Sequence, residues 1–507
     1  MAKNIFNSVQ LLKPKSNVFD LTHDVKLSMD MGKLTPIMTM ECIPGDKVKL
    51  SGDALIRFSP LVAPIMHRLD VSIHYFFVPN RILWENWEKW IVNEKIAGSP
   101  IQHPYYTIEK DGSNYSPLMD YMGIPNPLLN TGGTPQNETV NPLPFAAYQK
   151  IYNDYYRDQN LIAEGTALLN DGDCSGLNIT QLRTRAWEHD YFTSSLPWAQ
   201  KGDAVLIPAN FDDVQVLRNN SGGAASNTLQ AAAGSTNQVI TNEGTTGPNI
   251  SANELYADTS TMSMNTDINE LRRALRLQEW LEKNARGGTR YIENILSHFG
   301  VKSSDKRLQR PEYITGVKSP VVISEVLNTT GTTGQLPQGN MAGHGVSVAT
   351  GKFGSYYCEE HGYIIGIMSV MPKTAYQQGI PKHFLKVNDP FEYFWPSFAH
   401  IGEQAVANRE VYAFDVDGSE TFGYVPRYAE YRFIPNTVAG QFRDQLDFWH
   451  MGRIFAAPPA LNSTFVSCDP TNRVFAITDA EEQKLYVQVV NKVMAIRPIP
   501  KFGTPML

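Results

Sequence analysis

Strand-like sequence lies near both ends of the chain, and this feature constrains the fold more than any other. Apolar and polar residues alternate through residues 47–51 and again from residue 71, which is the two-residue period of a half-buried strand. From Phe76 the second segment is apolar at successive positions, as in a strand that enters a sandwich core. Residues 363–371 form a continuous apolar run, and residues 485–496 again have strand character. A barrel or sandwich closed by strands from both ends of the chain fits this pattern, because such closure removes exposed sheet edges.

The composition also favours strands joined by long ordered loops. Only 19% of the 507 residues are charged, whereas 37 are glycine, 32 are proline and 11% are aromatic. Helix-rich proteins usually carry more charge on their solvent faces. A chain of this length can hold two or three average domains, or one β domain with long insertions, and the composition favours the second arrangement. Few charges and many aromatic residues are also typical of surfaces that become hidden in contacts between subunits.

Several segments depart from the strand pattern. Residues 1–30 are polar with scattered apolar positions, which predicts an N-terminal arm, and residues 31–507 then form the single main domain. Residues 99–145 contain eight prolines, so we expect a long ordered loop without regular elements. A second loop, rich in glycine, is predicted for residues 328–354.

A further segment, residues 212–262, has the composition of a surface insertion. Its central part, residues 219–254, consists mainly of Asn, Ser, Thr, Gly and Ala and has no aromatic residue. Such a segment buries little apolar area, so it is expected on an outer surface as a protrusion that the fold does not need. A passive spacer or a contact between subunits is the alternative interpretation.

Three segments show helical periodicity. The strongest pattern spans residues 267–286 and begins with Asp267 and Glu270, which resemble a capping box. A second helix is predicted from Tyr291 to Phe299, ending at Gly300. A short helix near residues 83–91 carries three tryptophans on one stripe, which indicates packing against the body or a neighbouring subunit more often than stacking on a ligand. These tryptophans are Trp84, Trp87 and Trp90.

The distribution of charge limits how the chain can contact nucleic acid. Its net charge is -7, whereas a protein that grips nucleic acid unaided is usually basic. Residues 271–310 are the exception, with ten basic and four acidic residues. This stretch is predicted to contact DNA or another subunit, and salt bridges within helices or between subunits are the alternative. The candidate contact residues are Arg272, Arg273, Arg276, Arg286, Arg290, Arg307 and Arg310.

The cysteines and the N-terminal sequence indicate where the chain is made. Four cysteines lie far apart, a spacing that fits neither a disulfide framework nor a zinc ribbon. We expect reduced thiols and synthesis in the cytoplasm, because residues 1–16 lack the layout of a signal peptide and the apolar runs are too short to span a membrane.

Motifs of enzymes and metal sites are weak throughout the sequence, so we expect no catalytic residue, cofactor or metal. Gly351 and Lys352 lack the upstream glycine of a phosphate-binding loop. Residues 358–361 contain four possible metal ligands but no second matching pair, so a loop or strand end is the preferred interpretation. Asp415 and Asp417 are spaced like a carboxylate pair of a glycosidase, although Asp417 followed by glycine is also a common turn.

Several long stretches resemble the major capsid proteins of microviruses, specifically the gokushovirus group. They are spread across nearly the whole chain, and the polar insertion near residues 219–254 is not among them. The stretches are Phe19–Thr22, Met31–Pro36, Leu271–Ala274, Glu282–Glu293, Ser297–Val301, Gln309–Tyr313 and Tyr424–Arg432.

This resemblance implies a mainly β fold, an eight-stranded antiparallel jelly-roll barrel with long loop insertions and a few short helices. It also implies a T=1 icosahedral shell, assembled from pentamers around circular single-stranded DNA, with one insertion that protrudes at the threefold axes. The implied partners are other copies of the chain, the genomic DNA, a small basic DNA-associated protein, a pilot protein, an internal scaffolding protein and a host-cell receptor. The expected locations are the virion and, during assembly, the host cytoplasm.

Two functions of other classes remain as alternatives at this point. One is a β-sandwich that binds carbohydrate, and the other is a glycosidase that uses Asp415. The mass of the native particle separates a capsid subunit from both.

Overall fold

The computed structural model describes residues 15–94, 101–129, 136–203, 205, 216–218, 230–231, 240–241, 255–257, 268–288, 290–327, 341–477, 479 and 481–501. The chain divides into two compact units. The larger unit combines residues 1–199 with residues 287–507, and the smaller unit is residues 200–286.

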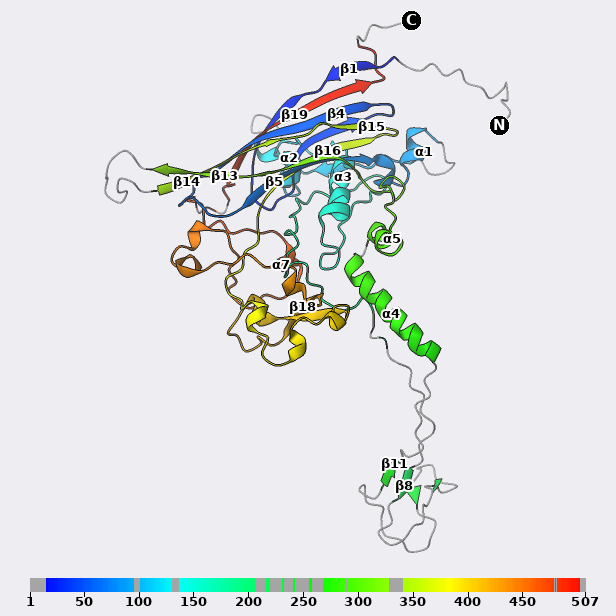
Figure 1. Cartoon of the computed structure of the whole chain (residues 1–507). Coiled ribbons are helices and arrows are strands. Elements are labelled where there is room, and N and C mark those ends of the chain that lie inside the picture. The colour runs from blue at the N-terminus through cyan, green and yellow to red at the C-terminus, as the bar shows by residue number, and fades with distance from the viewer. Residues whose placement is uncertain are drawn as a thin grey trace. The chain divides into compact units, whose positions relative to one another are not determined.

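Two antiparallel sheets dominate the larger unit (Figure 1). The first has the strand order β1-β19-β4-β14-β13, with β2 also paired to β19 and β15 also paired to β4. The second has the order β12-β5-β16-β3. The strands of the first sheet are β1 (Asn17–Asp20), β2 (His23–Met29), β4 (Lys47–Phe58), β13 (Val322–Leu327), β14 (Met341–Thr350), β15 (Gly354–Tyr357) and β19 (Leu485–Arg497). Those of the second are β3 (Thr35–Cys42), β5 (Leu69–Pro79), β12 (Glu312–Pro320) and β16 (Gly362–Pro372).

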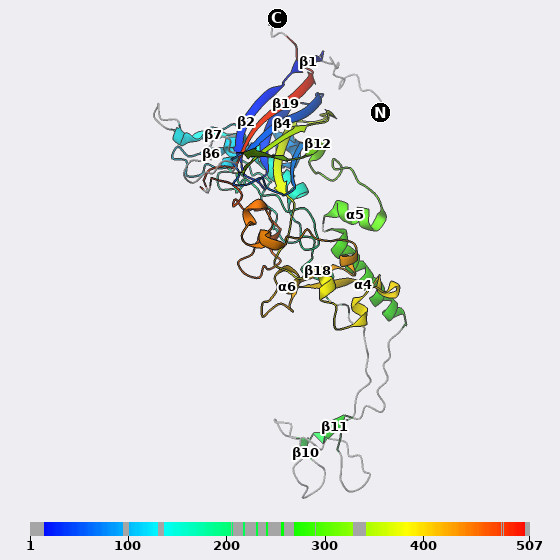
Figure 2. The same ribbon diagram turned by 60° about the vertical axis from the view of Figure 1, so that its left-hand side comes forward.

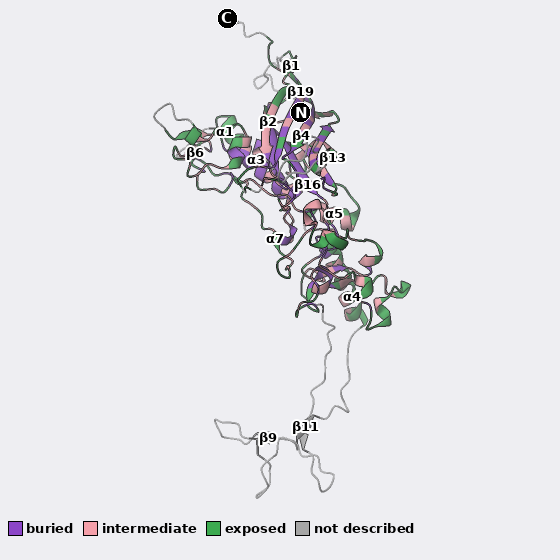
Figure 3. Cartoon of the chain, turned by 90° about the vertical axis from the view of Figure 1, so that its left-hand side faces the viewer, coloured by how far each residue is buried: buried purple, intermediate pink, exposed green. Residues whose placement is uncertain are grey.

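The two sheets share one apolar core, and β16 in the middle of the second sheet is buried on both faces (purple in Figure 3), whereas its edge strand β12 is partly exposed. In β5, Val71 and Ile73 lie in the core between the sheets, whereas Phe76 and Val78 lie in a second core on the opposite face. The predicted change of β5 from alternating to continuously apolar sequence is therefore confirmed. All eleven residues of β16 are buried, which agrees with its predicted role as a buried strand.

A polar bridge crosses the core between the sheets. The Tyr75 hydroxyl donates to Asn491 Oδ1 at 2.7 Å, and Asn491 Nδ2 donates to the Ile37 carbonyl at 2.8 Å. Tyr75 belongs to β5 and Asn491 to β19, so the bond joins the two sheets. Both side chains are buried, and their hydrogen bonds satisfy polar groups that would otherwise destabilise the core.

The prediction that residues 99–145 contain no regular element is wrong. This segment forms β6 (Tyr106–Ile108), α2 (Pro117–Tyr121), β7 (Glu138–Val140) and the start of α3 (Leu143–Ile151). Prolines stand in the first turns of α2 and α3, where a missing backbone N–H costs nothing because it has no partner within the helix. Helix α3 continues as a π-helical turn, Tyr152–Tyr156, and its buried face contributes to the second core.

Two other predicted boundaries differ from the structure. Residues 17–29, predicted as part of an arm, form β1 and β2 and pair with β19. Residues 341–350, predicted as part of a glycine-rich loop, form β14 and pair with β4. Here glycine allows close approach of the chain, because a side chain at Gly345 would come within 2.7 Å of the Phe58 ring. Residues 1–14 and 328–340 lie outside the described residues.

Residues 373–468, here called the irregular region, contain only short elements around a third apolar core (Figures 1 and 2). Its helices and strands are β17 (Glu403–Ala407), α6 (Asn408–Val411), β18 (Thr421–Pro426) and α7 (Ser463–Val466). It also has six short 3-10 helices among its described residues: η6 (Lys382–Phe384), η7 (Pro390–Glu392), η8 (Pro396–Phe398), η9 (Ala429–Tyr431), η10 (Gly440–Arg443) and η11 (Asp447–Trp449).

The two longer predicted helices are present, whereas the helix predicted near residues 83–91 is confined to Trp87–Ile91, so Trp84 lies before it. Helix α5 (Tyr291–Phe299) has the predicted ends, and Gly300 follows it with a φ of 68°. In the smaller unit, α4 (Ile268–Gly287) matches the strongest helical pattern, although Asp267 of the predicted capping box lies outside the described residues. Elsewhere in this unit the structure describes β8 (Val216–Arg218) paired with β11 (Leu255–Ala257), and β9 (Gln230–Ala231) paired with β10 (Ile240–Thr241). Most of the predicted protrusion, residues 212–262, lies outside the described residues.

Candidate assembly and nucleic-acid surfaces

Two of the predicted contact arginines bind the end of the π-helical turn. Arg290 Nη2 donates to the carbonyls of Asn153 and Arg157, both at 2.9 Å, and Arg310 Nη2 donates to the Asp154 carbonyl at 2.8 Å. The last carbonyls of a helix lack partners within it and carry partial negative charge, so guanidinium groups stabilise them. Arg290 and Arg310 therefore stabilise a turn of their own chain.

Tyrosines of the same turn are each faced by an arginine. The guanidinium carbon of Arg310 lies 5.0 Å from the centre of the Tyr155 ring, and that of Arg185 lies 5.6 Å from Tyr156. His74 Nδ1 lies 2.7 Å from the Tyr156 hydroxyl. Burial, followed by the positive charges of Arg185 and Lys318, lowers the pKa of His74 to about 4. The imidazole is therefore neutral at neutral pH.

The remaining predicted contact arginines are exposed. Arg272, Arg273 and Arg276 lie along α4 in the smaller unit, and Arg276 pairs with Glu279 at 2.5 Å. Arg286 is exposed near the end of the same helix, and Arg307 is exposed in a turn of the larger unit. Contact of the seven arginines with DNA or another subunit stays a prediction.

The predicted tryptophan stripe forms one aromatic cluster. Trp84 is only 1% exposed, and its indole N–H donates to Asp171 Oδ1 at 2.7 Å, so it packs within its own chain. Trp87 and Trp90 lie toward the surface on α1 (Trp87–Ile91), with their ring centres 5.9 Å apart. Their packing against a neighbouring subunit stays a prediction.

The four possible metal ligands of residues 358–361 have separate partners. Cys358 is buried, Glu359 pairs with Lys306, Glu360 pairs with Arg81 at 3.1 Å, and the His361 ring lies against Trp87. Across the described part of the chain, no three His, Cys, Asp or Glu side chains gather as a metal site.

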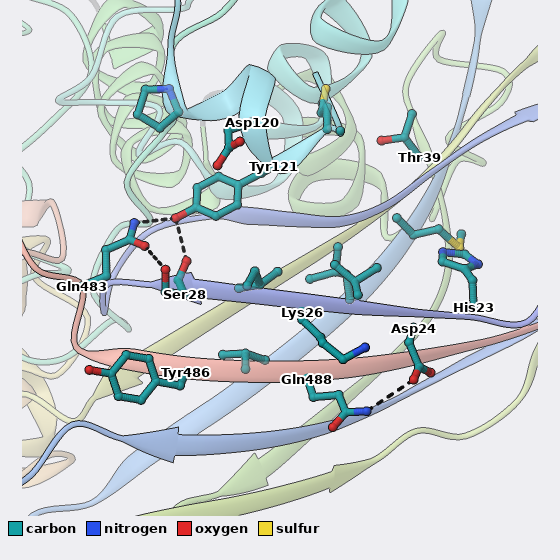
Figure 4. A pocket seen from close by; sticks show the side chains of 18 of the residues that line it. His23, Asp24, Lys26, Ser28, Thr39, Asp120, Tyr121, Gln483, Tyr486 and Gln488 are labelled. Carbon is teal, nitrogen blue, oxygen red and sulfur yellow. Dashed lines mark hydrogen bonds between the residues drawn. The ribbon is translucent and has the colours of Figure 1, made fainter. Parts of the chain in front are cut away.

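A large open groove of about 1360 Å³ lies where β2, β3, β19 and α2 meet (Figure 4). Its polar side chains bind one another across these elements. The Tyr121 hydroxyl donates to the Ser28 carbonyl at 2.9 Å and accepts a bond from Gln483 at 2.7 Å, while Gln488 donates to Asp24 at 3.3 Å. These bonds join α2 to the edge of the sandwich, which gives the polar groups of the groove a structural role.

The irregular region exposes a surface that the sequence interpretation missed. Several large apolar side chains of residues 384–395 lie open to solvent. We call these the aromatic surface: Phe384, Val387, Phe391, Tyr393, Phe394 and Trp395. The clue in the sequence was the density of aromatic residues in a segment without strand or helix periodicity.

Beside this surface is a cavity of about 330 Å³, here called the apolar pocket. Buried aromatic side chains form part of its lining, and more exposed apolar side chains complete it. Its main apolar residues are Tyr191, Phe192, Tyr376, Ile380, Phe433 and Ile434.

Two ion pairs lie in the wall of the apolar pocket. Lys382 contacts Glu410 at 2.9 Å, and Lys386 contacts Glu430 at 2.6 Å. Burial alone would raise the pKa of Glu430, but hydrogen bonds from Lys386 and Gln404 outweigh burial and lower it. The wall therefore contains charges that are already compensated.

Comparison with known proteins places the chain in a family. The profile of the phage family described as "Capsid protein (F protein)" matches residues 8–507. The chain belongs to this family. It is 36% identical to Capsid protein VP1 of Bdellovibrio phage phiMH2K, over 96% of this chain and 94% of that protein. It is 33% identical to Capsid protein VP1 of Chlamydia phage 1, over 100% and 98% of the two chains, and 31% identical to that of Spiroplasma virus 4, over 97% and 95%.

Family membership confirms the main prediction from the sequence. The chain is a microvirus capsid protein, a structural component of the virion that self-assembles, and it is not an enzyme. The glycosidase alternative is therefore wrong. In agreement, Asp415 and Asp417 form a turn, in which the Gly418 N–H donates to the Asp415 carbonyl at 3.2 Å. No helix within the described ranges has both the length and the apolar character needed to cross a membrane.

Proposed function

We propose that the chain assembles, through pentamers, into a T=1 icosahedral shell that encloses a circular single-stranded DNA genome. The observation that carries this proposal is the order of eight strands in the two sheets. One sheet contains β2-β19-β4-β14 and the other β3-β16-β5-β12. Among these eight strands the chain crosses between the sheets at each step except from β5 to β12, and this alternation supports an eight-stranded jelly roll. This fold recurs in viral capsid domains.

Electron cryo-microscopy of particles purified from infected cells tests this proposal. The expected reconstruction has icosahedral symmetry, with one copy of the chain in each asymmetric unit and the eight strands in jelly-roll order. A particle with another symmetry, or one in which this chain is a minor component, contradicts it.

The exposed arginines of α4 are the proposed contacts with DNA or a neighbouring subunit. With a net charge of -7, the chain also needs a separate basic partner to neutralise the genome, and a small DNA-associated virion protein fits that requirement. Replacing Arg272, Arg273 and Arg276 with Gln is expected to lower particle yield or DNA content while the subunit stays folded. Full particles in normal yield would contradict this assignment.

Residues 212–262 are proposed to form an outward protrusion that contributes to attachment to a host-cell receptor. The support is their composition, because small polar side chains add little to a core, and they fall within a unit that is compact by itself. Long insertions also cost a fold little, since closure entropy grows slowly with loop length.

Replacing residues 212–262 with a short Gly-Ser linker separates the possible roles. We expect particles that assemble but adsorb poorly to the native host. Failure of assembly would assign the segment to the architecture of the shell, and unchanged adsorption would place attachment elsewhere. An internal scaffolding protein during assembly in the host cytoplasm and a pilot protein in the virion complete the proposed partners.

A further inference from the structure

A turn in the irregular region presents two apolar side chains to solvent. Phe414 is 98% exposed and Val416 is 89% exposed, which are extreme values for such residues. Phe414 also has a φ of 65°, in the left-handed region that a bulky residue rarely adopts. Strained backbone that holds a side chain in an unfavourable place is a feature of functional sites.

The base of this turn is held by hydrogen bonds on both sides. The Ala413 N–H donates to the Gln378 carbonyl at 2.9 Å, and the Arg409 N–H donates to the Gly418 carbonyl at 3.0 Å. The Glu420 N–H closes a further bond to the Asp417 carbonyl at 3.0 Å. The fold therefore presents Phe414 on an anchored turn.

The same chain offers a cavity suited to such a side chain. The apolar pocket has a volume of about 330 Å³, and Tyr191, Phe192 and Tyr376 in its lining are buried. Its lysines are already paired with Glu410 and Glu430, so an incoming apolar ring meets no uncompensated charge. Aromatic rings around a ring also favour edge-to-face packing.

The turn is acidic, and the charges near the pocket include one exposed arginine and two carboxylates of the neighbouring segment, Asp389 and Glu392. Residues 414–420 contain three acidic residues and no Lys or Arg, and their carboxylates form no ion pair with any residue that the structure describes. Arg432 is exposed beside Tyr431 and Phe433 of the pocket and likewise has no ion pair among the described residues. The acidic turn also disfavours nucleic acid as its partner, because phosphates would repel it.

We propose that Phe414 of one copy inserts into the apolar pocket of a neighbouring copy. A shell built from identical chains needs complementary surfaces on every copy, and a projection and a cavity on the same chain meet that need. The aromatic surface next to the pocket then becomes covered in the same contact. This inference rests on the proposed shell and names a contact within it.

The variant F414G tests the proposal without disturbing the fold. Glycine adopts a φ of 65° without strain, so the thermal stability of the unassembled subunit is expected to stay equal or rise. Particle yield is expected to fall about tenfold or more, because the contact is lost from every copy. Yield equal to that of the unaltered chain overturns the proposal. If F414G particles assemble normally but adsorb poorly to the host, the turn contacts the host and the proposal is wrong.

Cross-linking identifies the pocket as the partner. Particles of V416C/I434C, which keep Phe414, are treated with a short bis-maleimide and separated under denaturing conditions. A ladder of covalent multimers is expected, whereas the control V416C/V322C, with its second cysteine on β13, stays monomeric. Absence of the ladder, or a cross-link within one chain only, overturns the proposal. Failure of the unaltered chain to form an icosahedral shell would instead refute the proposed function.

Discussion

Strand β16 and the aromatic surface of the irregular region are both rich in large apolar side chains, yet the chain buries one and exposes the other. Every residue of β16 is buried, between two cores. In residues 384–395 six large apolar side chains are exposed, although an apolar core lies in the same region. The comparison indicates that the sandwich uses its apolar area for folding, whereas the irregular region keeps part of its apolar area for association.

The largest expected difference in the free energy of unfolding is between a side-chain truncation in β16 and one in the aromatic surface. Ile364 is fully buried between the sheets, so I364A should lower the free energy of unfolding by about 2–5 kcal/mol, through lost burial and the cavity left behind. F384A removes an exposed ring and should change it by less than about 0.5 kcal/mol. Urea unfolding of the unassembled subunits measures both. Equal changes in the free energy of unfolding for I364A and F384A would contradict the inference that β16 serves folding and the aromatic surface does not.

Paired charges should stabilise the irregular region alongside its apolar core. The Lys386 side chain is only 3% exposed, and K386M leaves the Glu430 carboxylate buried with Gln404 as its remaining partner. We expect a loss of about 3 kcal/mol in urea unfolding, since an unpaired buried charge is costly.

The double variant K386M/E430Q is the control for this prediction. It removes both charges and should recover part of the loss. A K386M subunit as stable as the unaltered chain would show that the pair adds nothing to this region.

Acid is expected to weaken the sandwich through His74. Its pKa is about 4 in the folded chain, below its ordinary value near 6.5, so between these pH values the unfolded chain binds more protons. The stabilisation is complete above pH 6.5 and declines as the pH falls toward 4, by on the order of 2–3 kcal/mol after allowance for partial exposure. Urea unfolding at pH 7.5 and pH 4.5 should show a smaller decline in H74Q than in the unaltered chain. An equal decline would assign the acid sensitivity to other groups.

Periodicity in the sequence predicted the elements that can be recognised without knowing which distant residues they contact. Helix α5 was predicted from Tyr291 to Phe299, with its end at Gly300. Strands β5 and β16 were predicted because continuous apolar runs of this length are typical of strands that are buried on both faces. The basic stretch was recognised, but its division into stabilising arginines, such as Arg290, and exposed ones, such as Arg272, depends on distant parts of the chain.

The features that were missed depend on tertiary contacts. Strand β14 has a glycine-rich sequence that forms a strand because β4 and β13 pair with it on both sides. Strand β2 looked like part of an arm because its pairing partner, β19, lies at the other end of the chain. The apolar pocket joins residues 191–192 with the irregular region, and no local spacing predicts such a cavity. Phe414 was passed over because the aspartates beside it predicted only a turn.

The central claim is that the irregular region exposes apolar side chains in order to bind neighbouring copies. Hydrogen–deuterium exchange of the backbone, compared between the unassembled subunit and the intact particle, tests it most directly. We expect strong additional protection on assembly in residues 384–395 and 413–418, and little change in β16, which is already buried in the subunit. Equal exchange of residues 384–395 and 413–418 in the subunit and the particle would contradict the account.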